Sequence, residues 1–566
     1  MQRRHFLERT TTGAAMLTTT GSGVARAQSP PPPAAAKGRP RIMFYHDGRH
    51  PLIYMYEPPM QKEEYESAVD ELAGTPVQAI MFGLGDGRTV LHDTKVGELW
   101  GHRVKKWPHP IFRRAHQNAR MLIDAGHDPL RVVCDRAHQM GMLLYPTLLM
   151  QLGSGNEQDS RTSNFRIQNR HLEIGARGGI DPSYPKGALQ LADYKQPEVR
   201  RERFALIDET LKRYPVDGFE LQLNYGSHYF RPDELDEGRK IMTEWIGEIH
   251  RAVIASGANR ELVVRVPGSL EGCWSIGLDV REWMKRKIVD VVVPQIFGGP
   301  ERIDVTLDVR AFVQAAKGTG TRIQPTLQSD VDSDRTQTAP IEMIRAAACN
   351  YWAQGIDGLY LAHWFNRWPY QAQFYEILRE LPHADIMAPK DKFYSLPAIS
   401  YRYPNLGDGL EPGMSVQLPK PLAEGRTAAV TFPVADDLKR WAKAGRVHEV
   451  LLRVRLTNTT ELDRYEFRFN GKPLAPEGHR RINETYKMSA PRYRVNGYWY
   501  IWRLDAAHWP ETGNNKFEVT LTKRDPDLIP GIALRDVELE IKYKMGKNFH
   551  RGQDPDLGPA QGSSPN

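Results

Sequence analysis

The sequence has few cysteines and few of the motifs that mark common enzyme classes. Cys134, Cys273 and Cys349 are scattered and lack Cys-x-x-Cys spacing, so neither a disulfide framework nor a zinc site is expected. No Gly-x-Ser-x-Gly motif, phosphate-binding loop, His-x-His or His-Glu-x-x-His spacing occurs. These absences argue against serine-hydrolase, nucleotide-dependent and metal-dependent chemistry, and no cofactor or metal is predicted.

The chain also lacks a concentrated charge of either sign. Its formal net charge is +7, but residues 1–28 contain four arginines against one glutamate. About +4 therefore remains on the rest, without the dense basic patch that nucleic-acid binding requires. We expect no nucleic-acid partner.

The first 28 residues have the features of an export signal. Arg3-Arg4-His5-Phe6-Leu7 matches a twin-arginine core, and Ala25-Arg26-Ala27 matches a small-residue cleavage site. The apolar run between them is too short and too polar for a permanent membrane span. Residues 29–40 are a proline-rich linker. We expect the twin-arginine translocon as a partner, and a mature protein that is periplasmic or secreted.

Strand and helix patterns alternate from residue 41 to residue 390. Helix starts such as Asp128-Pro129 and Gln196-Pro197 separate the apolar runs. Eight predicted strands begin near Arg41, Val77, Gly141, Val216, Glu261, Asp290, Thr321 and Ile356. This order predicts an α/β fold, a (β/α)8 TIM barrel, with long loops after its first three strands. The rival is a doubly wound open sheet, but Asp47-Gly48-Arg49 stands where that fold usually has its glycine-rich loop.

Residues 398–545 show a different pattern. Short alternating runs near Val450, Tyr465, Phe517 and Val537, with a turn signal at Asn470-Gly471, predict a C-terminal β-sandwich. Residues 546–566 are rich in Gly, Pro and Ser and are predicted to be a disordered tail.

The fourth predicted strand, around residues 216–224, is the most informative segment. Side chains alternate across a strand, so Glu220, Gln222 and Asn224 share one face. Strands of parallel sheets are usually apolar on both faces. We expect this polar face to point into the mouth of the barrel, where such folds place their active sites. The alternative is a half-exposed edge strand with its polar side in water.

Polar residues occur at the ends of seven of the eight predicted strands. Amides, arginine and histidine form directional hydrogen bonds to hydroxyl-rich ligands, and tryptophans in nearby loops can stack on sugars. The predicted substrate-binding residues are His46, Tyr145, Gln222, Asn224, Arg265, Gln295, Gln324, His363, Trp364 and Asn366. The other candidate stacking residues are Trp100, Trp274 and Trp368. The set indicates a carbohydrate substrate.

Glycoside cleavage needs a carboxylic acid to protonate the leaving oxygen, and usually a second carboxylate as nucleophile or base. Glu220 is the predicted acid, because burial at the barrel mouth raises the pKa of a carboxyl group. Arg265 either binds an acidic sugar or forms an ion pair with Glu220. In order of preference, the candidates for the second carboxylate are Asp47, Glu271, Asp86 and Asp330.

Several blocks of the barrel region resemble the family-10-like glycoside hydrolases, a group of bacterial TIM-barrel proteins. Ala188-Leu-Gln-Leu-Ala-Asp-Tyr-Lys-Gln-Pro-Glu-Val-Arg200 and Tyr214-Pro-Val-Asp-Gly-Phe-Glu-Leu-Gln222 are similar to that family's pattern. Val264-Arg-Val-Pro267 and Gly355-Ile-Asp-Gly-Leu-Tyr360 match later blocks. The resemblance covers residues 41–381 and implies a barrel that acts on glycosides.

The chain departs from that family's pattern at one position of the fourth strand. Gln222 stands where the pattern has an aspartate, and an amide cannot act as a base at neutral pH. The resemblance therefore implies a role for Glu220 but not an aspartate-dependent mechanism. Two further functions stay open: a polysaccharide lyase on uronic acids with Tyr145 or His363 as base, and a glycan-binding protein without activity.

Overall fold

The computed structural model describes residues 39–52, 56–151, 156–224, 228–296, 302–331, 338–398, 416–474, 479–483 and 497–544. The predicted export signal, nearly all of the linker and the predicted C-terminal tail lie outside these residues. Among the described helices, none combines the length and the apolar character needed to cross a membrane.

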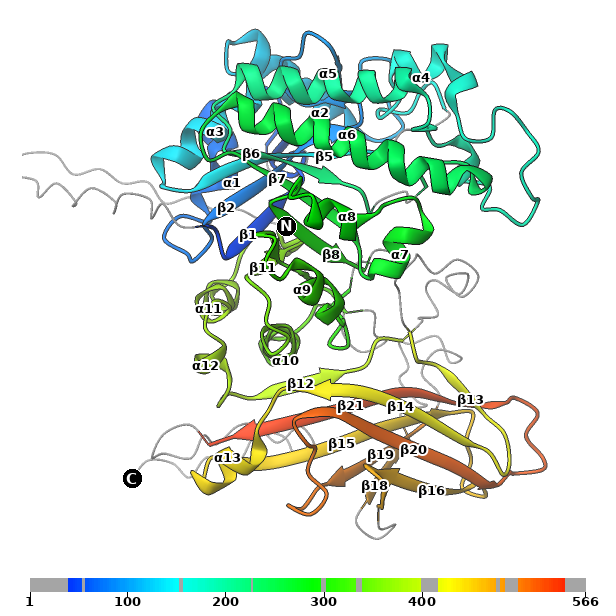
Figure 1. Ribbon diagram of the computed structural model, residues 1–566. Helices are drawn as coiled ribbons and strands as arrows, with labels where there is room; N and C mark the ends of the chain where they lie inside the picture. Colours follow the sequence, from blue (N-terminus) through cyan, green and yellow to red (C-terminus); the bar gives the residue numbers. More distant parts are fainter. Residues whose placement is uncertain are drawn as a thin grey trace, which may run out of the picture.

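A curved parallel sheet is the centre of the N-terminal part (Figure 1). All eight predicted strands are present, the seventh as two short pieces. The parallel strands are β1 (Ile42–His46), β2 (Ala79–Asp86), β5 (Leu143–Leu149), β6 (Gly218–Gln222), β7 (Glu261–Pro267), β8 (Val291–Gln295), β9 (Arg322–Ile323), β10 (Thr326–Leu327) and β11 (Leu359–Leu361). The small strands β3 (Thr89–Val90) and β4 (Glu98–Leu99) extend the sheet beyond β2.

The strand order is β10-β11-β1-β2-β5-β6-β7-β8-β9, with parallel pairing throughout. The first and last members of this order, β10 and β9, are separated in sequence only by Gln324 and Pro325. The carboxyl ends of all these parallel strands lie at the same edge of the sheet, since neighbouring strands run in the same direction. This half-barrel, covered by helices, confirms the α/β prediction.

Helices connect the strands and cover the outer face of the sheet (Figure 1). They are α1 (Lys62–Asp70), α2 (Pro110–Asp124), α3 (Pro129–Gln139), α4 (Asn164–Gln168), α5 (Pro197–Arg213), α6 (Leu235–Ser256), α7 (Leu270–Ser275), α8 (Val280–Lys285), α9 (Arg310–Ala316), α10 (Ile341–Trp352), α11 (Ala372–Glu380) and α12 (Ala384–Met387). The Asp128 side chain accepts a hydrogen bond from the Leu130 N–H, which confirms the predicted cap of α3.

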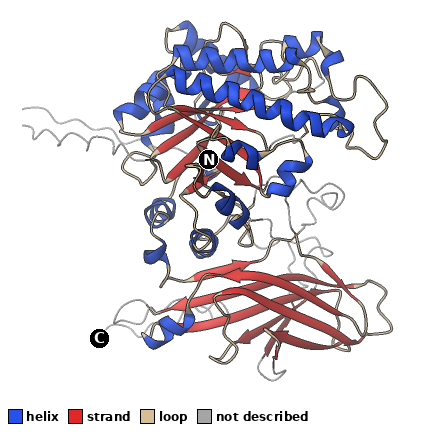
Figure 2. Cartoon of the chain, viewed as in Figure 1, coloured by secondary structure: helices blue, strands red, loops and turns tan. Residues whose placement is uncertain are grey.

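The C-terminal part contains two antiparallel sheets, drawn as red arrows in Figure 2. The first has the order β12-β21-β15-β19-β18, with β13 beside β21, and the second has the order β14-β20-β16-β17. Their strands are β12 (Lys392–Ser395), β13 (Lys420–Leu422), β14 (Thr427–Val434), β15 (Val447–Thr457), β16 (Arg464–Phe469), β17 (Lys472–Pro473), β18 (His479–Asn483), β19 (Tyr498–Arg503), β20 (Gly513–Lys523) and β21 (Ile532–Tyr543). A short helix, α13 (Leu438–Lys443), lies between β14 and β15.

Specific contacts join the two sheets to each other and to the parallel-sheet part. The Phe467 ring of β16 lies 4.9 Å from the rings of Tyr500 and Trp502 on β19. Asn350 of α10 donates a hydrogen bond to the carbonyl of Pro433 on β14. The predicted Asn470-Gly471 turn is present, with positive φ at both residues, between β16 and β17.

Candidate functional site

The inner face of the parallel sheet carries its own apolar cluster, separate from the main core under the helices. Its members include Met43, Met81, Val263, Val291 and Val293. Glu220 on β6 belongs to the same face, because it lies in register with Val263 of the neighbouring strand β7. The prediction that the polar face of the fourth strand points inward is therefore supported by the register.

Glu220 is locked in a hydrogen-bonded ion pair. Its Oε1 accepts a hydrogen bond of 2.8 Å from Arg265 Nε, and the side chains of both residues are 0% exposed. The Tyr360 hydroxyl donates to both carboxylate oxygens, at 3.0 and 2.8 Å. One carboxylate thus accepts hydrogen bonds from a guanidinium and a phenol.

Two tyrosine rings hold the Arg265 guanidinium between them. The guanidinium carbon lies 4.4 Å from the centre of the Tyr45 ring and 4.7 Å from that of Tyr360. Burial lowers the pKa of Arg265, but Glu220 and the tyrosines outweigh this effect and raise the pKa above its ordinary value. Burial also raises the pKa of Tyr360 well above its ordinary value, so this hydroxyl keeps its proton.

This geometry argues against the general-acid role predicted for Glu220. A general acid must carry a proton and reach the leaving oxygen. Glu220 instead pairs with Arg265 and has no exposed surface from which to reach a leaving oxygen. The alternative reading of Arg265, an ion pair with Glu220, is the one that the structure contains.

A group of polar side chains lies beside Glu220 and further toward the carboxyl ends of the strands; Thr147 is in register with Glu220, and Arg265 with Gln222. Each carries a buried nitrogen or oxygen atom without a hydrogen-bond partner in the described part of the chain. This polar cluster consists of Thr147, Gln222, Asn224, Arg265, Gln295 and Gln328, and the unpartnered atoms are Thr147 Oγ1, Gln222 Oε1, Asn224 Oδ1, Arg265 Nη2, Gln295 Nε2 and both amide atoms of Gln328. A buried polar atom without a partner costs about 1–3 kcal/mol, so such a concentration requires a reason.

Hydrogen bonds connect the members of the polar cluster on β6, β7 and β8. Asn224 Nδ2 donates to Gln295 Oε1 at 3.0 Å, and Arg265 Nη1 reaches the same oxygen at 3.4 Å. In both amides one polar atom is hydrogen-bonded, while the other, Asn224 Oδ1 or Gln295 Nε2, has no partner within the described residues. The arrangement offers donors and acceptors together, which suits a ligand rich in hydroxyl groups.

Asp47 lies at the carboxyl end of β1, where the chain turns sharply. Its Oδ1 accepts hydrogen bonds from the backbone N–H groups of Arg49 and His50, at 3.0 and 2.8 Å. Gly48 has φ +71°, and a side chain there would lie 2.3 Å from the carbonyl oxygen of Gly83 on β2. Glycine is therefore required for this turn to close against the neighbouring strand.

The surroundings of Asp47 favour its charged form. Burial raises the pKa of this carboxyl group, but Arg49, the two neighbouring histidines and the His50 N–H outweigh burial and leave the pKa below its usual value. Asp47 is thus suited to act as a base or nucleophile rather than as an acid.

Aromatic rings surround the same end of the sheet. His46 stacks on Phe82 with 5.5 Å between ring centres, and burial lowers its pKa to about 4. His363, directly after β11, lies 5.1 Å from the Tyr45 ring and adopts φ +58°. A histidine in this left-handed region is strained, and such strain is common next to ligand sites.

Two predicted substrate-binding residues lie at the opposite end of the sheet. The Tyr145 hydroxyl donates to Glu261, the first residue of β7, at 3.0 Å. Gln324 Nε2 donates to the carbonyl of Pro40, just before β1, at 2.6 Å. Both partners belong to the amino ends of their strands, so the structure separates Tyr145 and Gln324 from the polar cluster. The predicted lyase base Tyr145 is therefore also misplaced.

Three more sequence-based candidates lie away from the polar cluster or cannot meet a sugar. Glu271 is on α7 with a side chain that is 76% exposed and pairs with Arg281. Trp364 is fully buried and donates to the carbonyl of Leu327, and Trp100 is equally buried. These tryptophans are core residues. Among the tryptophans predicted to stack on sugars, Trp274 has an open surface, at 51% exposure.

Asn366, Asp86 and Asp330 are the remaining sequence-based candidates. Asn366 lies in the short helix η5 (Trp364–Arg367), and its side chain, like that of Asp86, is outside the described residues. Asp330 follows β10 by three residues. Within the described residues, no three His, Cys, Asp or Glu side chains come together as they would around a metal ion.

The roles of Tyr45 and Tyr360, which complete the surroundings of Arg265, were not predicted from the sequence. Both read as ordinary apolar strand residues, although the two-residue repeat from Tyr360 to Ala362 would have placed them on the inner face. The Tyr360 hydroxyl donates to Glu220, the predicted acid, and so helps to hold its carboxylate in place.

Comparisons with known proteins give fold likenesses at low similarity. No protein-family model matches this chain, and no curated protein matches it in sequence. A cycloisomaltooligosaccharide glucanotransferase from Paenibacillus sp. aligns at 9% identity with a TM-score of 0.35, over 88% of this chain and 57% of that one. The alpha-L-fucosidase isoenzyme 2 from Paenibacillus thiaminolyticus aligns at 12% and 0.40, over 62% and 50%.

A third solved structure is the PgaB (BpsB) glycoside hydrolase domain from Bordetella bronchiseptica. It aligns at 12% identity with a TM-score of 0.38, over 60% of this chain and 98% of that one. This chain thus spans about half the length of the first two structures and nearly all of the third. At these scores the likenesses carry no weight for the function.

Proposed function

We propose that this chain is an exported glycoside hydrolase that binds its glycan at the polar cluster. The observation that carries the proposal is the set of unpartnered buried amide atoms on Gln222, Asn224 and Gln295. Sugar hydroxyl groups both donate and accept hydrogen bonds, so a bound glycan supplies the partners that these amides lack. An amide side chain also carries both a donor and an acceptor, so amides at the strand ends match a ligand rich in hydroxyl groups.

The proposed architecture is a closed (β/α)8 barrel followed by a β-sandwich. The chain would close the barrel through the two-residue break between β9 and β10, which pair with β8 and β11. Export by the twin-arginine translocon, and action in the periplasm or outside the cell, remain predictions from residues 1–28.

Asp47 and Asp330 are the carboxylates that we propose for catalysis. They follow β1 and β10, the two strands that flank β11, so both stand at the carboxyl ends of the sheet. Asp47, with its lowered pKa, would act as base or nucleophile. Glu220 becomes a positioning residue, because it orients Arg265, whose Nη1 in turn holds Gln295.

The test is the release of new reducing ends from a panel of plant, algal and bacterial polysaccharides. Asp47→Asn should lower the rate by at least about 100-fold, which is the usual loss for an acid-base group. Its amide oxygen can still accept the two N–H bonds of the turn, so folding should be kept. Asp308→Asn, at a half-exposed aspartate paired with Arg310, is the matched control and should leave the rate unchanged.

Non-catalytic glycan binding is a second candidate, favoured by the complete burial of Glu220. Saturable binding of a glycan, with no reducing ends formed over days, would replace the hydrolase proposal with this one. A product that absorbs in the ultraviolet would instead indicate a lyase, for which His363 is the remaining predicted base.

A further inference from the structure

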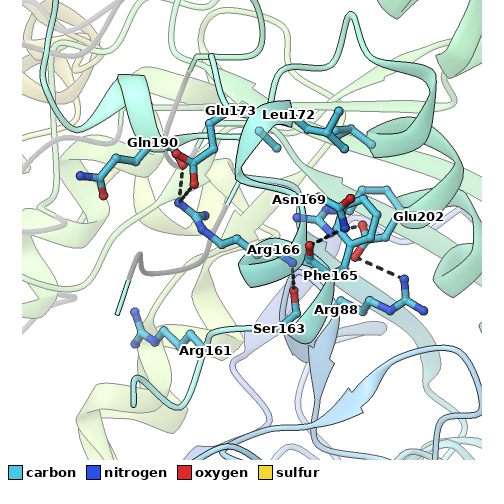
Figure 3. Close-up of a pocket in the computed structure, with 13 residues that line it drawn as sticks. Arg88, Arg161, Ser163, Phe165, Arg166, Asn169, Leu172, Glu173, Gln190 and Glu202 are labelled. Atoms are coloured by element: carbon cyan, nitrogen blue, oxygen red, sulfur yellow. Dashed lines mark hydrogen bonds and ion pairs between the residues drawn. The ribbon is translucent and has the colours of Figure 1, made fainter. Parts of the chain in front are cut away.

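A polar cavity lies beside the sheet, under the segment between β5 and α5 (Figure 3). Its walls come from the β2–β3 turn, from residues 161–173, from residues 190–192 and from the first turns of α5. The cavity measures about 30 Å³. A water needs roughly 10–15 Å³ by this measure, so the space fits a group of two oxygen atoms and is too small for a sugar ring.

Arginines dominate the walls of this cavity, which we call the arginine pocket. Arg88, Arg161, Arg166 and Arg203 line it, against two carboxylates, Glu173 and Glu202. Each carboxylate is shared: Glu202 pairs with both Arg203 and Arg88, and Glu173 with Arg166 and the nearby Arg170. Positive charge therefore exceeds negative charge around the cavity.

Two of these arginines keep donors that make no hydrogen bond, although Arg88 Nε lies 4.0 Å from Oε2 of a third carboxylate, Glu98. Arg88 Nε and Arg166 Nε are buried and have no hydrogen-bond partner within the described residues. Figure 3 shows Arg88 beside Glu202 and Arg166 beside Glu173, on opposite sides of the space. Burial lowers the pKa of Arg166; Glu173 opposes this effect, whereas Arg203 and Arg170 add to it.

The arginine pocket is connected to the polar cluster through one residue. Met150 directly follows β5; its N–H donates to the carbonyl of Gln222 at 3.2 Å. The carbonyl of the same Met150 accepts a hydrogen bond of 3.2 Å from Arg203 Nε. Met150 is thus hydrogen-bonded both to the backbone of Gln222 and to an arginine of the pocket.

We propose that the arginine pocket receives a carboxylate of the glycan bound at the polar cluster, so that the substrate is a uronic-acid polysaccharide. The inference rests on the proposed function, since the sugar backbone is held at the polar cluster. The size of the cavity favours a carboxylate, and the guanidinium donors supply the charge-assisted hydrogen bonds that select it.

The test is calorimetric titration of the full chain with a panel of uronic-acid oligosaccharides, each compared with its methyl ester. The ester removes the charge and leaves the sugar unchanged. The acid should bind at least 10-fold more tightly than its ester, and Arg88→Gln and Arg166→Gln should each remove most of this preference. Arg88→Lys should restore part of it, because the charge returns without the planar donor set.

Arg201→Gln is the matched control, because Arg201 lies on α5 next to Glu202 but is 69% exposed and faces solvent. It should leave the acid preference intact. Melting temperatures of all variants separate loss of binding from loss of folding.

Equal affinity for acid and ester, or a preference that survives Arg88→Gln and Arg166→Gln in folded protein, would overturn the inference while leaving glycan binding in place. Failure of every acid and every ester to bind would overturn the proposed function as well. Binding of sodium acetate as tightly as the oligosaccharides would show a site for a free anion and would also overturn the inference.

Discussion

Glu220 and Gln222 stand two residues apart on the same face of β6, yet their surroundings are opposite. Glu220 accepts hydrogen bonds from Arg265 and Tyr360 and is sealed from solvent. Gln222 is also buried, but its amide oxygen has no partner in the described part of the chain. A buried group whose bonds are complete stabilises the fold, whereas one with incomplete bonds is available to a ligand. The comparison thus divides one polar strand into a structural layer and a layer that we propose binds the glycan, called the binding layer below.

The largest expected effect comes from breaking the structural layer. Glu220→Gln leaves the buried Arg265 guanidinium without its counter-charge, which should cost about 3–5 kcal/mol of unfolding free energy. Urea denaturation of the variant and the wild type measures this difference. A variant as stable as the wild type would show that the ion pair has no structural role.

Acid should destabilise the protein through His46. Burial lowers its pKa in the folded state to about 4, against 6.5 in the unfolded chain. The unfolded state therefore binds more protons between these values, so the stability is full above pH 6.5 and is lost as pH falls toward 4. The loss should reach about 3 kcal/mol, with a slope near 1.4 kcal/mol per pH unit.

The His46→Phe variant keeps an aromatic ring against Phe82 and removes the titrating group. Its unfolding free energy should fall less steeply with acid than that of the wild type, by about the slope of one proton. Equal slopes for the two proteins would mean that His46 is protonated in the folded state as readily as in the unfolded chain.

Tyr360→Phe should have a smaller effect than Glu220→Gln. The ring that packs on Arg265 is kept, and only the hydroxyl that bonds Glu220 is lost, at an expected cost of about 1.5–3 kcal/mol. Equilibrium denaturation gives the value. A loss as large as that of Glu220→Gln would assign the stability of this layer to the phenol rather than to the ion pair.

Gln222→Met should leave stability unchanged or raise it by about 1 kcal/mol, because an apolar side chain of similar length replaces a buried amide with an unpartnered oxygen. The same denaturation measurement applies. A loss above about 2 kcal/mol would indicate that the amide makes bonds within the fold and would remove Gln222 from the binding layer.

Glu271→Gln should have the smallest effect. Its side chain is 76% exposed and its partner Arg281 is 54% exposed, and such surface pairs contribute little. We expect a change within about 0.5 kcal/mol and no change in glycan affinity. A loss of glycan affinity would return Glu271 to the site.

Much of the fold could be predicted from the sequence, because apolar runs and helix starts have a strong local signal. All eight parallel strands begin within a few residues of their predicted positions, and α3 and α5 start at the predicted prolines. The alternation of Glu220, Gln222 and Asn224 also gave the correct face. Strand seven differs, because Pro325 cannot donate to the ladder and divides it into β9 and β10.

The site was harder to predict, because the sequence pattern gives the face on which a strand residue lies but not the end of the sheet to which it belongs. Tyr145 and Gln324 lie on inner faces, as expected, but they bond to the amino ends of neighbouring strands. Hydrogen-bond partners far away in sequence determine the surroundings of other site residues; Tyr360, for example, lies 140 residues from Glu220. The arginine pocket combines residues from four separate segments, and no local motif reveals such a group.

The most direct test of the two-layer account is the affinity of a bound oligosaccharide for wild type and for Gln222→Met, measured by isothermal titration calorimetry. The account predicts that a glycan from the polysaccharide panel binds the wild type, and that the variant, although as stable, binds it at least 10-fold more weakly. Equal affinity of the two proteins would contradict it, because the unpartnered amide would then have no part in binding.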